Sequence, residues 1–101
     1  GKKEILLDRI VYIESNLHKL NFHVLEADYV IYTLYETLNL IEKRFQEYDF
    51  VRIHQSYLVN LKYIKDIVNY NVYLVDGTNL PVAKPRYKHV RECFAIFKGE
   101  I

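Results

Sequence analysis

The segment FVRIHQSYLVNLKYIKDI, residues 50–67, places an arginine, a histidine, a glutamine, a serine and an asparagine among aromatic and branched apolar residues. Two of them, Arg52 and Gln55, have long side chains with chemistry suited to nucleic acid. A guanidinium pairs with phosphate or guanine, and a carboxamide can bond adenine twice through the major groove. If Ile53 and residues 57–59 face a core, Arg52 and Gln55 should project outward. The pattern indicates a binding surface, with an ordinary solvated turn as the alternative.

The remaining polar residues of this segment have a structural explanation. His54 and Asn60 could satisfy backbone groups in a turn that joins FVRI to YLVNLKYI, because buried polar side chains need partners. On this interpretation they shape a loop and contact nothing outside the chain.

A second polar cluster is the basic run KPRYKHVR, residues 84–91, which contains no acid, whereas acids outnumber bases over residues 26–49. Pro85 is well tolerated in a first helical turn, so the run is expected to lead into a helix N-terminus. Backbone N–H groups there favour anions. Phosphate contact by Lys84 and Arg86 is therefore predicted, with a solvated helix face as the alternative.

The sequence gives little support to a catalytic or metal-binding function. The four histidines and Cys93 form no H-x-x-x-H or C-x-x-C spacing, and no G-x-S-x-G motif or glycine-rich loop is present. We expect no enzyme activity, no metal and no cofactor. A single cysteine favours a reducing cytoplasm, and the apolar runs are too short to cross a bilayer. A cytoplasmic location without membrane contact is expected.

The hydrophobic pattern predicts many short strands and two short helices. Residues 3–15 alternate as one or two short strands. Residues 17–33 also alternate and are broken by EAD into a hairpin, with Leu20, Phe22 and Val24 on one face and Lys19, Asn21 and His23 on the other. Three further strands are expected between residues 63 and 83. Helices are expected from Leu34, with Thr33 and Glu36 as a capping box, and over residues 85–97. The 101 residues predict a single, mainly β domain, excised from a longer protein.

Four blocks in order resemble one known family: YIES at 12–15, TLYETLNLIEKRF from 33, FVRIHQSYLVNLKYI from 50 and LVDGTNLPVAKPRYKHV from 74. They are similar to the LytTR DNA-binding domains, and the likeness covers residues 4–91. The resemblance implies an elongated fold of short antiparallel sheets with one or two short helices. It also implies an output domain of a bacterial two-component response regulator, whose loops enter successive major grooves of duplex DNA.

The resemblance places DNA contacts on three loops. They fall on His18 with Lys19 beside it, on Gln55, and on Lys84 and Arg86. Arg52, His54, Ser56 and Asn60 match the family's signature; the last three are expected to shape the loop, and Arg52 stays open between phosphate contact and structure. Where the family commonly has Ser-Arg after LPV, this chain has Ala83-Lys84. The substitution favours phosphate contact over base contact from that loop.

Partners follow from the same resemblance: duplex DNA, an upstream receiver or sensor domain, and a second copy if two domains occupy direct-repeat sites. The alternative function is a protein-interaction module that uses exposed tyrosines, of which the chain has ten, and open sheet edges.

Overall fold

The computed structural model describes residues 4–100, which form eight strands, two α-helices and three short 3₁₀ helices. In chain order the elements are η1 Leu7–Arg9, β1 Ile10–Asn16, β2 Lys19–Leu25, β3 Tyr29–Leu34, α1 Leu38–Arg44, β4 Phe50–His54, β5 Tyr57–Asn60, η2 Leu61–Tyr63, β6 Ile64–Val68, β7 Asn71–Leu74, β8 Asn79–Pro81, η3 Lys84–Arg86 and α2 Tyr87–Phe97. The described part measures 43 × 28 × 25 Å, and the predicted elongated, mainly β fold is confirmed.

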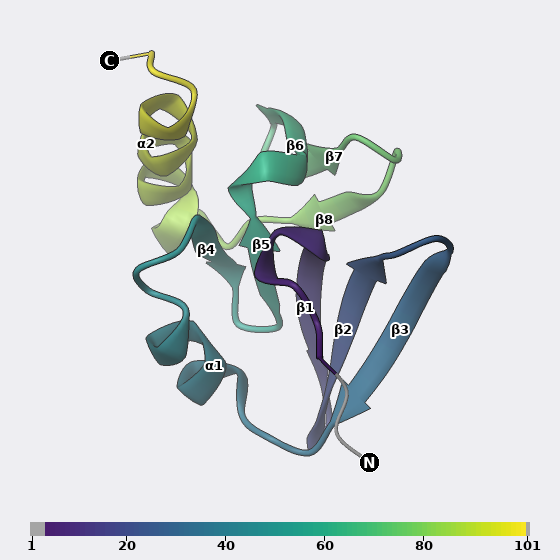
Figure 1. Cartoon of the computed structure of the whole chain (residues 1–101). Coiled ribbons are helices and arrows are strands. Elements are labelled where there is room, and N and C mark those ends of the chain that lie inside the picture. The colour runs from purple at the N-terminus through teal and green to yellow at the C-terminus, as the bar shows by residue number, and fades with distance from the viewer. Residues whose placement is uncertain (1–3, 101) are drawn as a thin grey trace.

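Two antiparallel sheets make up the fold (Figure 1). The larger has the strand order β3-β2-β1-β5-β4, and the smaller has the order β6-β7-β8. The smaller sheet is the predicted three-stranded meander. Its first turn holds Asn69 and Tyr70 at φ values of 51° and 62°, and its second contains Gly77 at φ 92°. Such left-handed values suit the tight connections of a hairpin.

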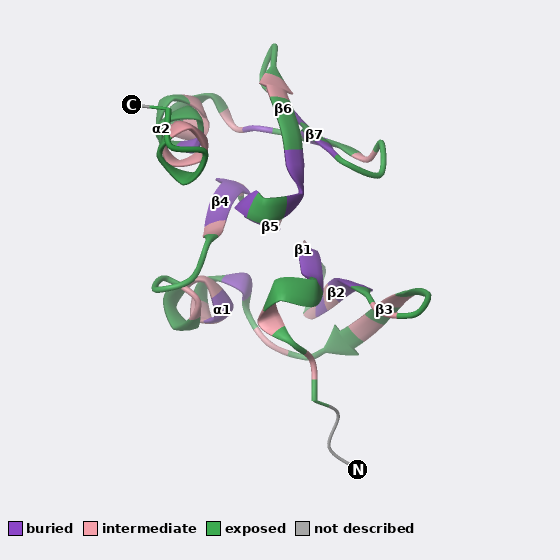
Figure 2. Cartoon of the chain, turned by 45° about the horizontal axis from the view of Figure 1, so that its top comes forward, coloured by how far each residue is buried: buried purple, intermediate pink, exposed green. Residues whose placement is uncertain are grey.

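Successive side chains of β1 and β5 point to opposite faces of the larger sheet, and consecutive apolar residues in these strands are buried on both faces. Ile13 and Leu58 face a cluster with Leu38 and Ile41 of α1. Because Ile13 and Leu58 are almost fully buried, α1 covers this face of the sheet. Figure 2 shows buried residues on β1 and on the edge strand β4, whereas β3 at the other edge is exposed or intermediate throughout.

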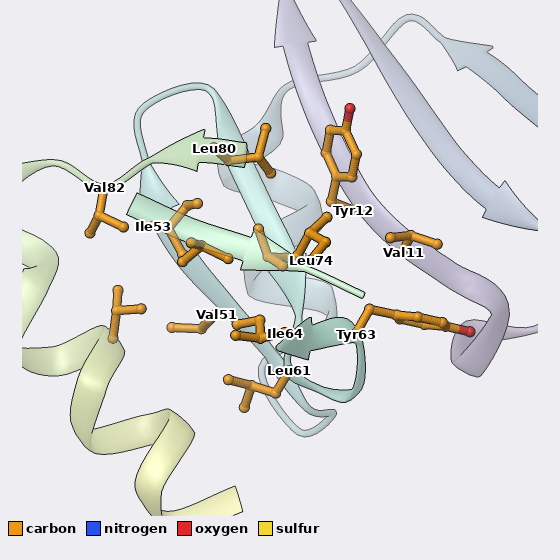
Figure 3. Packing of buried hydrophobic residues seen from close by; sticks show 13 residues of the cluster. Val11, Tyr12, Val51, Ile53, Leu61, Tyr63, Ile64, Leu74, Leu80 and Val82 are labelled. Carbon is orange, nitrogen blue, oxygen red and sulfur yellow. The ribbon is translucent and has the colours of Figure 1, made fainter. Parts of the chain in front are cut away.

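The opposite face of the larger sheet packs against the smaller sheet and α2. Tyr12 of β1 and Ile53 of β4 lie in one cluster with Leu74, Leu80 and residues of η2 (Figure 3). From α2, Val90 is fully buried in this cluster, with Cys93 and Phe94 packed against it. The predicted apolar side of α2 is confirmed for Val90 and Phe94, whereas Phe97 is 41% exposed.

The predicted start of the first helix was wrong. β3 continues to Leu34, and α1 begins only at Leu38. Thr37, not Thr33, is the N-cap, because its hydroxyl accepts a hydrogen bond from the Leu40 N–H at 3.2 Å. Thr33 instead pairs with Asn21 across β2 and β3.

No helix within residues 4–100 has the length and apolar character that a membrane crossing would need.

Candidate nucleic-acid interface

The β4–β5 hairpin carries Gln55 at its tip. His54 pairs with Tyr57, so Gln55 and Ser56 form a two-residue turn, preceded by a register shift between Arg52 and His54. Gln55 is exposed, as predicted. Gln55 and Ser56 are not among the described residues with positive φ. This turn therefore lacks the left-handed backbone favoured by two-residue hairpins, and side chains support it instead.

Arg52 does not project outward, contrary to the prediction. Its side chain is 5% exposed. Inside the hairpin, Nε donates to the His54 carbonyl at 2.7 Å and Nη2 donates to the Gln55 carbonyl. From the other direction, Nη1 donates to Asn39 Oδ1 at 2.9 Å and to Glu42 Oε1 at 2.7 Å. Sequence spacing did not show these acceptors, because they come from α1 and from turn carbonyls.

His54 and Ser56 shape the turn, whereas Asn60 acts elsewhere. His54 Nδ1 accepts a hydrogen bond from the Ser56 N–H at 3.1 Å, and the Ser56 carbonyl accepts one from the Ser15 N–H at 2.9 Å. Asn60 lies at the far end of β5, where Nδ2 donates to the Ile10 carbonyl at 2.9 Å and Oδ1 accepts from the Lys62 N–H. Asn60 thus caps η2 and holds it to β1.

The β1–β2 hairpin carries a second predicted contact residue. Asn16 pairs with Lys19, so Leu17 and His18 form its two-residue turn. His18 is exposed and Lys19 is half-buried. Leu17 adopts φ 59° and is 87% exposed, the highest value among the large apolar residues with exposed side chains. Sequence analysis did not single out Leu17; the signal available was a lone apolar residue between the polar ends of two alternating strands.

The basic loop lies beside β4. The Ala83 N–H donates to the Ile53 carbonyl at 2.9 Å, which brings η3 alongside the strand that leads to Gln55. In η3, Lys84 is exposed and Arg86 is partly exposed. The 11-residue helix α2 follows directly, so the predicted placement of the basic run at a helix start is correct.

One surface hollow unites these three segments. Leu17 and His18, Gln55 and Ser56, and Arg86 all line it, together with residues 36–39 at the start of α1 and the buried Arg52. Residues far apart in sequence thus meet on one side of the molecule. Lys19 and Lys84 do not line the hollow, although each adjoins a residue or segment that does.

A polar network centred on the buried His23 of the larger sheet lies outside this hollow. His23 lies on the face opposite Leu20, Phe22 and Val24, as predicted, but is only 7% exposed, stacked on Tyr12 with ring centroids 4.0 Å apart. Its Nε2 lies 2.9 Å from Glu14 Oε1, and its Nδ1 lies 2.9 Å from the Tyr29 hydroxyl. Burial, with smaller effects from Asp76 and Glu14, raises the pKa of Tyr29 to about 12. Both ring nitrogens of His23 therefore have a partner, which explains why a histidine is tolerated there.

Cys93 and His89 lie close together on α2, as the thiol and imidazole of a reactive pair would. Cys93 Sγ lies 3.4 Å from His89 Nε2 on α2. Burial first, and Glu92 second, raise the pKa of the Cys93 thiol, which disfavours the nucleophilic thiolate. Within residues 4–100 no three His, Cys, Asp or Glu side chains are grouped so as to hold a metal ion.

The exposed tyrosines do not belong to one element. They include Tyr29 of β3, Tyr35 and Tyr48 on either side of α1, and Tyr70 and Tyr73 of the smaller sheet.

Comparison with known proteins agrees with this arrangement. The profile of the LytTr DNA-binding domain matches residues 2–95. The chain is 37% identical over 70 residues to the sensory transduction protein LytT of Bacillus subtilis, covering 64% of this chain and 29% of that protein. It is 38% identical over 58 residues to the transcriptional regulatory protein LytR of Staphylococcus aureus, covering 52% of this chain and 24% of that protein.

Fold comparison gives the same result. The LytTr DNA-binding domain of a DNA response regulator from Bacillus cereus superposes with a TM-score of 0.73, covering 85% of this chain and 81% of that one at 22% identity. The chain belongs to the LytTr DNA-binding domain family, a non-catalytic class of domain. It spans less than a third of the length of the LytT and LytR proteins just described.

Proposed function

We propose that this domain binds specific duplex DNA sequences as the output domain of a bacterial transcriptional regulator of the two-component type. The observation that supports this most directly is the convergence of His18, Gln55 and Arg86 around one hollow, from three separate loops. Exposed turns on a rigid sheet can enter a major groove and contact base edges there. In our proposal the two hairpin turns and the basic loop occupy successive major grooves.

Each predicted residue has a chemical role in this proposal. Gln55 is exposed on a supported turn and contacts a base edge. Lys84 and Arg86 contact phosphates, because the neighbouring Ala83 offers no hydroxyl and lysine is a point charge. His18, with Lys19 beside it, contacts a base or a phosphate from the β1–β2 turn.

Arg52 has a different role because its guanidinium is already occupied. Four protein acceptors surround it, and its side chain is 5% exposed. We therefore assign Arg52 to holding the turn that carries Gln55, in place of phosphate contact.

The wider setting is also part of the proposal. Since the chain spans 29% of LytT and 24% of LytR, we infer that a receiver or sensor domain precedes it in the full-length protein, in the cytoplasm. Two copies would bind direct-repeat sites as a homodimer. No cofactor, metal or membrane contact is needed for this function.

The test is selection of bound duplexes from genomic fragments at two salt concentrations. We expect enrichment of a shared sequence, and an affinity that falls steeply with salt because Lys and Arg displace condensed counterions. A strong chelator should leave binding unchanged. If no shared sequence is enriched even at low salt, the DNA-binding proposal fails, and the alternative of a protein-interaction module that uses the exposed tyrosines and sheet edges is favoured.

A further inference from the structure

Leu17 occupies a position that its side chain does not favour. Its φ of 59° is left-handed, a region that apolar residues with a Cβ rarely adopt and that glycine or asparagine enters easily. It is also the first of the two turn residues, where hairpins with a left-handed first position take glycine. A strained backbone held by its surroundings is a reason to look for function at that residue.

The side chain of Leu17 takes no part in the buried cores. It is 87% exposed, and it belongs to neither of the two buried clusters. A leucine is therefore kept where both backbone conformation and solvent exposure disfavour it. Burial against an apolar group of a partner would account for that choice, since apolar surface gains free energy when it leaves water.

The neighbours of Leu17 define which partner that is. His18 is next to it, and both residues line the hollow that Gln55 and Arg86 also line. On the proposed function, this hollow faces the major groove of duplex DNA. The apolar group that a base pair presents in the major groove is the 5-methyl of thymine, and apolar side chains are its usual contacts.

We propose that Leu17 is a specificity-determining residue whose side chain packs against the 5-methyl group of one thymine in the bound duplex. The inference rests on the proposed DNA-binding function and adds a contact that does not depend on hydrogen bonding. The β1–β2 turn would then distinguish thymine through Leu17, while Gln55 distinguishes a different base from the β4–β5 turn.

Deoxyuridine substitution tests this contact, because uracil keeps the pairing edge of thymine and lacks only the methyl group. In the preferred duplex, each thymidine is replaced in turn, and affinity is measured for the unaltered domain and for Leu17→Ala. For the unaltered domain we expect one replacement to weaken binding about three- to fivefold, which is the change in affinity expected when the burial of one methyl group is lost. For Leu17→Ala the same replacement should change nothing.

Three variants serve as controls. Leu17→Gly also removes the contact but permits the left-handed φ, so it should lose the deoxyuridine effect without lowering the melting temperature. Leu6→Ala removes a similarly exposed leucine, 67% exposed and outside the hollow, and should keep the effect. Gln55→Ala should keep it too, since its contact is a separate one.

The outcomes separate this inference from the proposed function. Enrichment of a duplex that is insensitive to every deoxyuridine replacement overturns the thymine contact and leaves DNA binding intact. The same holds if Leu17→Ala shows an undiminished penalty, or if the preferred duplex contains no thymine. Failure to enrich any duplex overturns both.

Discussion

Gln55 and Lys84 are both exposed but carry different chemistry toward DNA. A carboxamide offers a donor and an acceptor in one plane, which matches the edge of a particular base. An ammonium is a strongly hydrated point charge, which any phosphate attracts equally. The two residues should therefore divide specificity and affinity between them.

The first prediction separates these contributions. Gln55→Ala should weaken binding to the preferred duplex by about 1–3 kcal/mol and relax the preference at one base-pair position, with little change in salt dependence. Lys84→Ala should weaken all duplexes by similar factors and lower the salt slope by about one unit. Both are measured by titration of base-substituted duplexes at several salt concentrations, after thermal melts confirm that each variant is folded.

Two results would contradict this division. Equal, sequence-independent losses from both variants would mean that Gln55 contacts phosphate. No loss from either variant would mean that the two loops face away from DNA.

For single residues, the sequence predicted solvent exposure well where the residue lies at a turn. It predicted exposure poorly where the hydrogen-bond partners of the residue are distant in the chain. Gln55 lies between two strands whose apolar alternation places it at a tip. Arg52 has the same local pattern, but its acceptors Asn39 and Glu42 are 13 and 10 residues away on α1. His23 was placed correctly on the face opposite Leu20, Phe22 and Val24, but its burial was not foreseen, because its partners Glu14 and Tyr29 come from neighbouring strands.

At the scale of elements, Arg52 links α1 to the turn that carries Gln55. The turn itself has neither glycine nor a described left-handed residue, so its shape depends on side chains. His54 binds the Ser56 N–H, while Arg52 binds the carbonyls of His54 and Gln55. Glu42 and Asn39 in turn fix the guanidinium. The position of α1 on the sheet thus sets the position of Gln55.

The second prediction is that Arg52→Lys loosens this turn. An ammonium cannot serve four acceptors in the geometry of a guanidinium, so we expect a loss of about 1.5–3 kcal/mol in unfolding free energy, the range for hydrogen bonds to charged groups. Amide hydrogen exchange in the free domain should accelerate at Gln55 and Ser56. Binding to the preferred duplex should weaken, and this loss should be smaller in a Gln55→Ala background, because the two residues act as a unit.

Arg44→Lys is the matched control, since Arg44 is exposed at the last turn of α1. It should change neither exchange nor binding. If Arg52→Lys instead lowered the salt slope by about one unit, with unchanged exchange at the turn, Arg52 would be a phosphate contact.

The sequence predicted the strands better than the helix boundary. Alternation fixes the strands because one face of each must be buried, as in Leu20, Phe22 and Val24 of β2. The start of α1 was missed because the local sequence makes both Thr33 and Thr37 plausible N-caps. Thr33 is followed three residues later by Glu36, and Thr37 directly precedes the apolar residue Leu38. Pairing of β3 with β2 as far as Leu34 decides between them, and that pairing is not visible in a local window.

At the scale of the whole molecule, β1 and β5 join the two cores. Ile13 and Leu58 face the core beneath α1, whereas Tyr12 and Val59, next to them in the chain, face the core shared with the smaller sheet. Both cores rest on the larger sheet, one on each of its faces, so loss of that sheet would expose both. Of the three loops that we propose to contact DNA, two are hairpin turns of the larger sheet, and the basic loop joins β8 of the smaller sheet to α2.

The third prediction follows from this sharing: the domain unfolds as one cooperative unit. Ile13→Ala in one core and Leu74→Ala in the other should each cost about 2–5 kcal/mol, since both side chains are at most 1% exposed. In urea, far-ultraviolet circular dichroism and tyrosine fluorescence should give coincident transitions for each variant. Ile96→Ala, at a side chain that is 64% exposed on α2, should stay within about 0.5 kcal/mol. A smaller sheet that lost its structure at lower urea than the larger one, in Leu74→Ala alone, would show that the cores are independent. The geometry of the basic loop, which lies between β8 and α2, would then depend on the core shared with the smaller sheet alone.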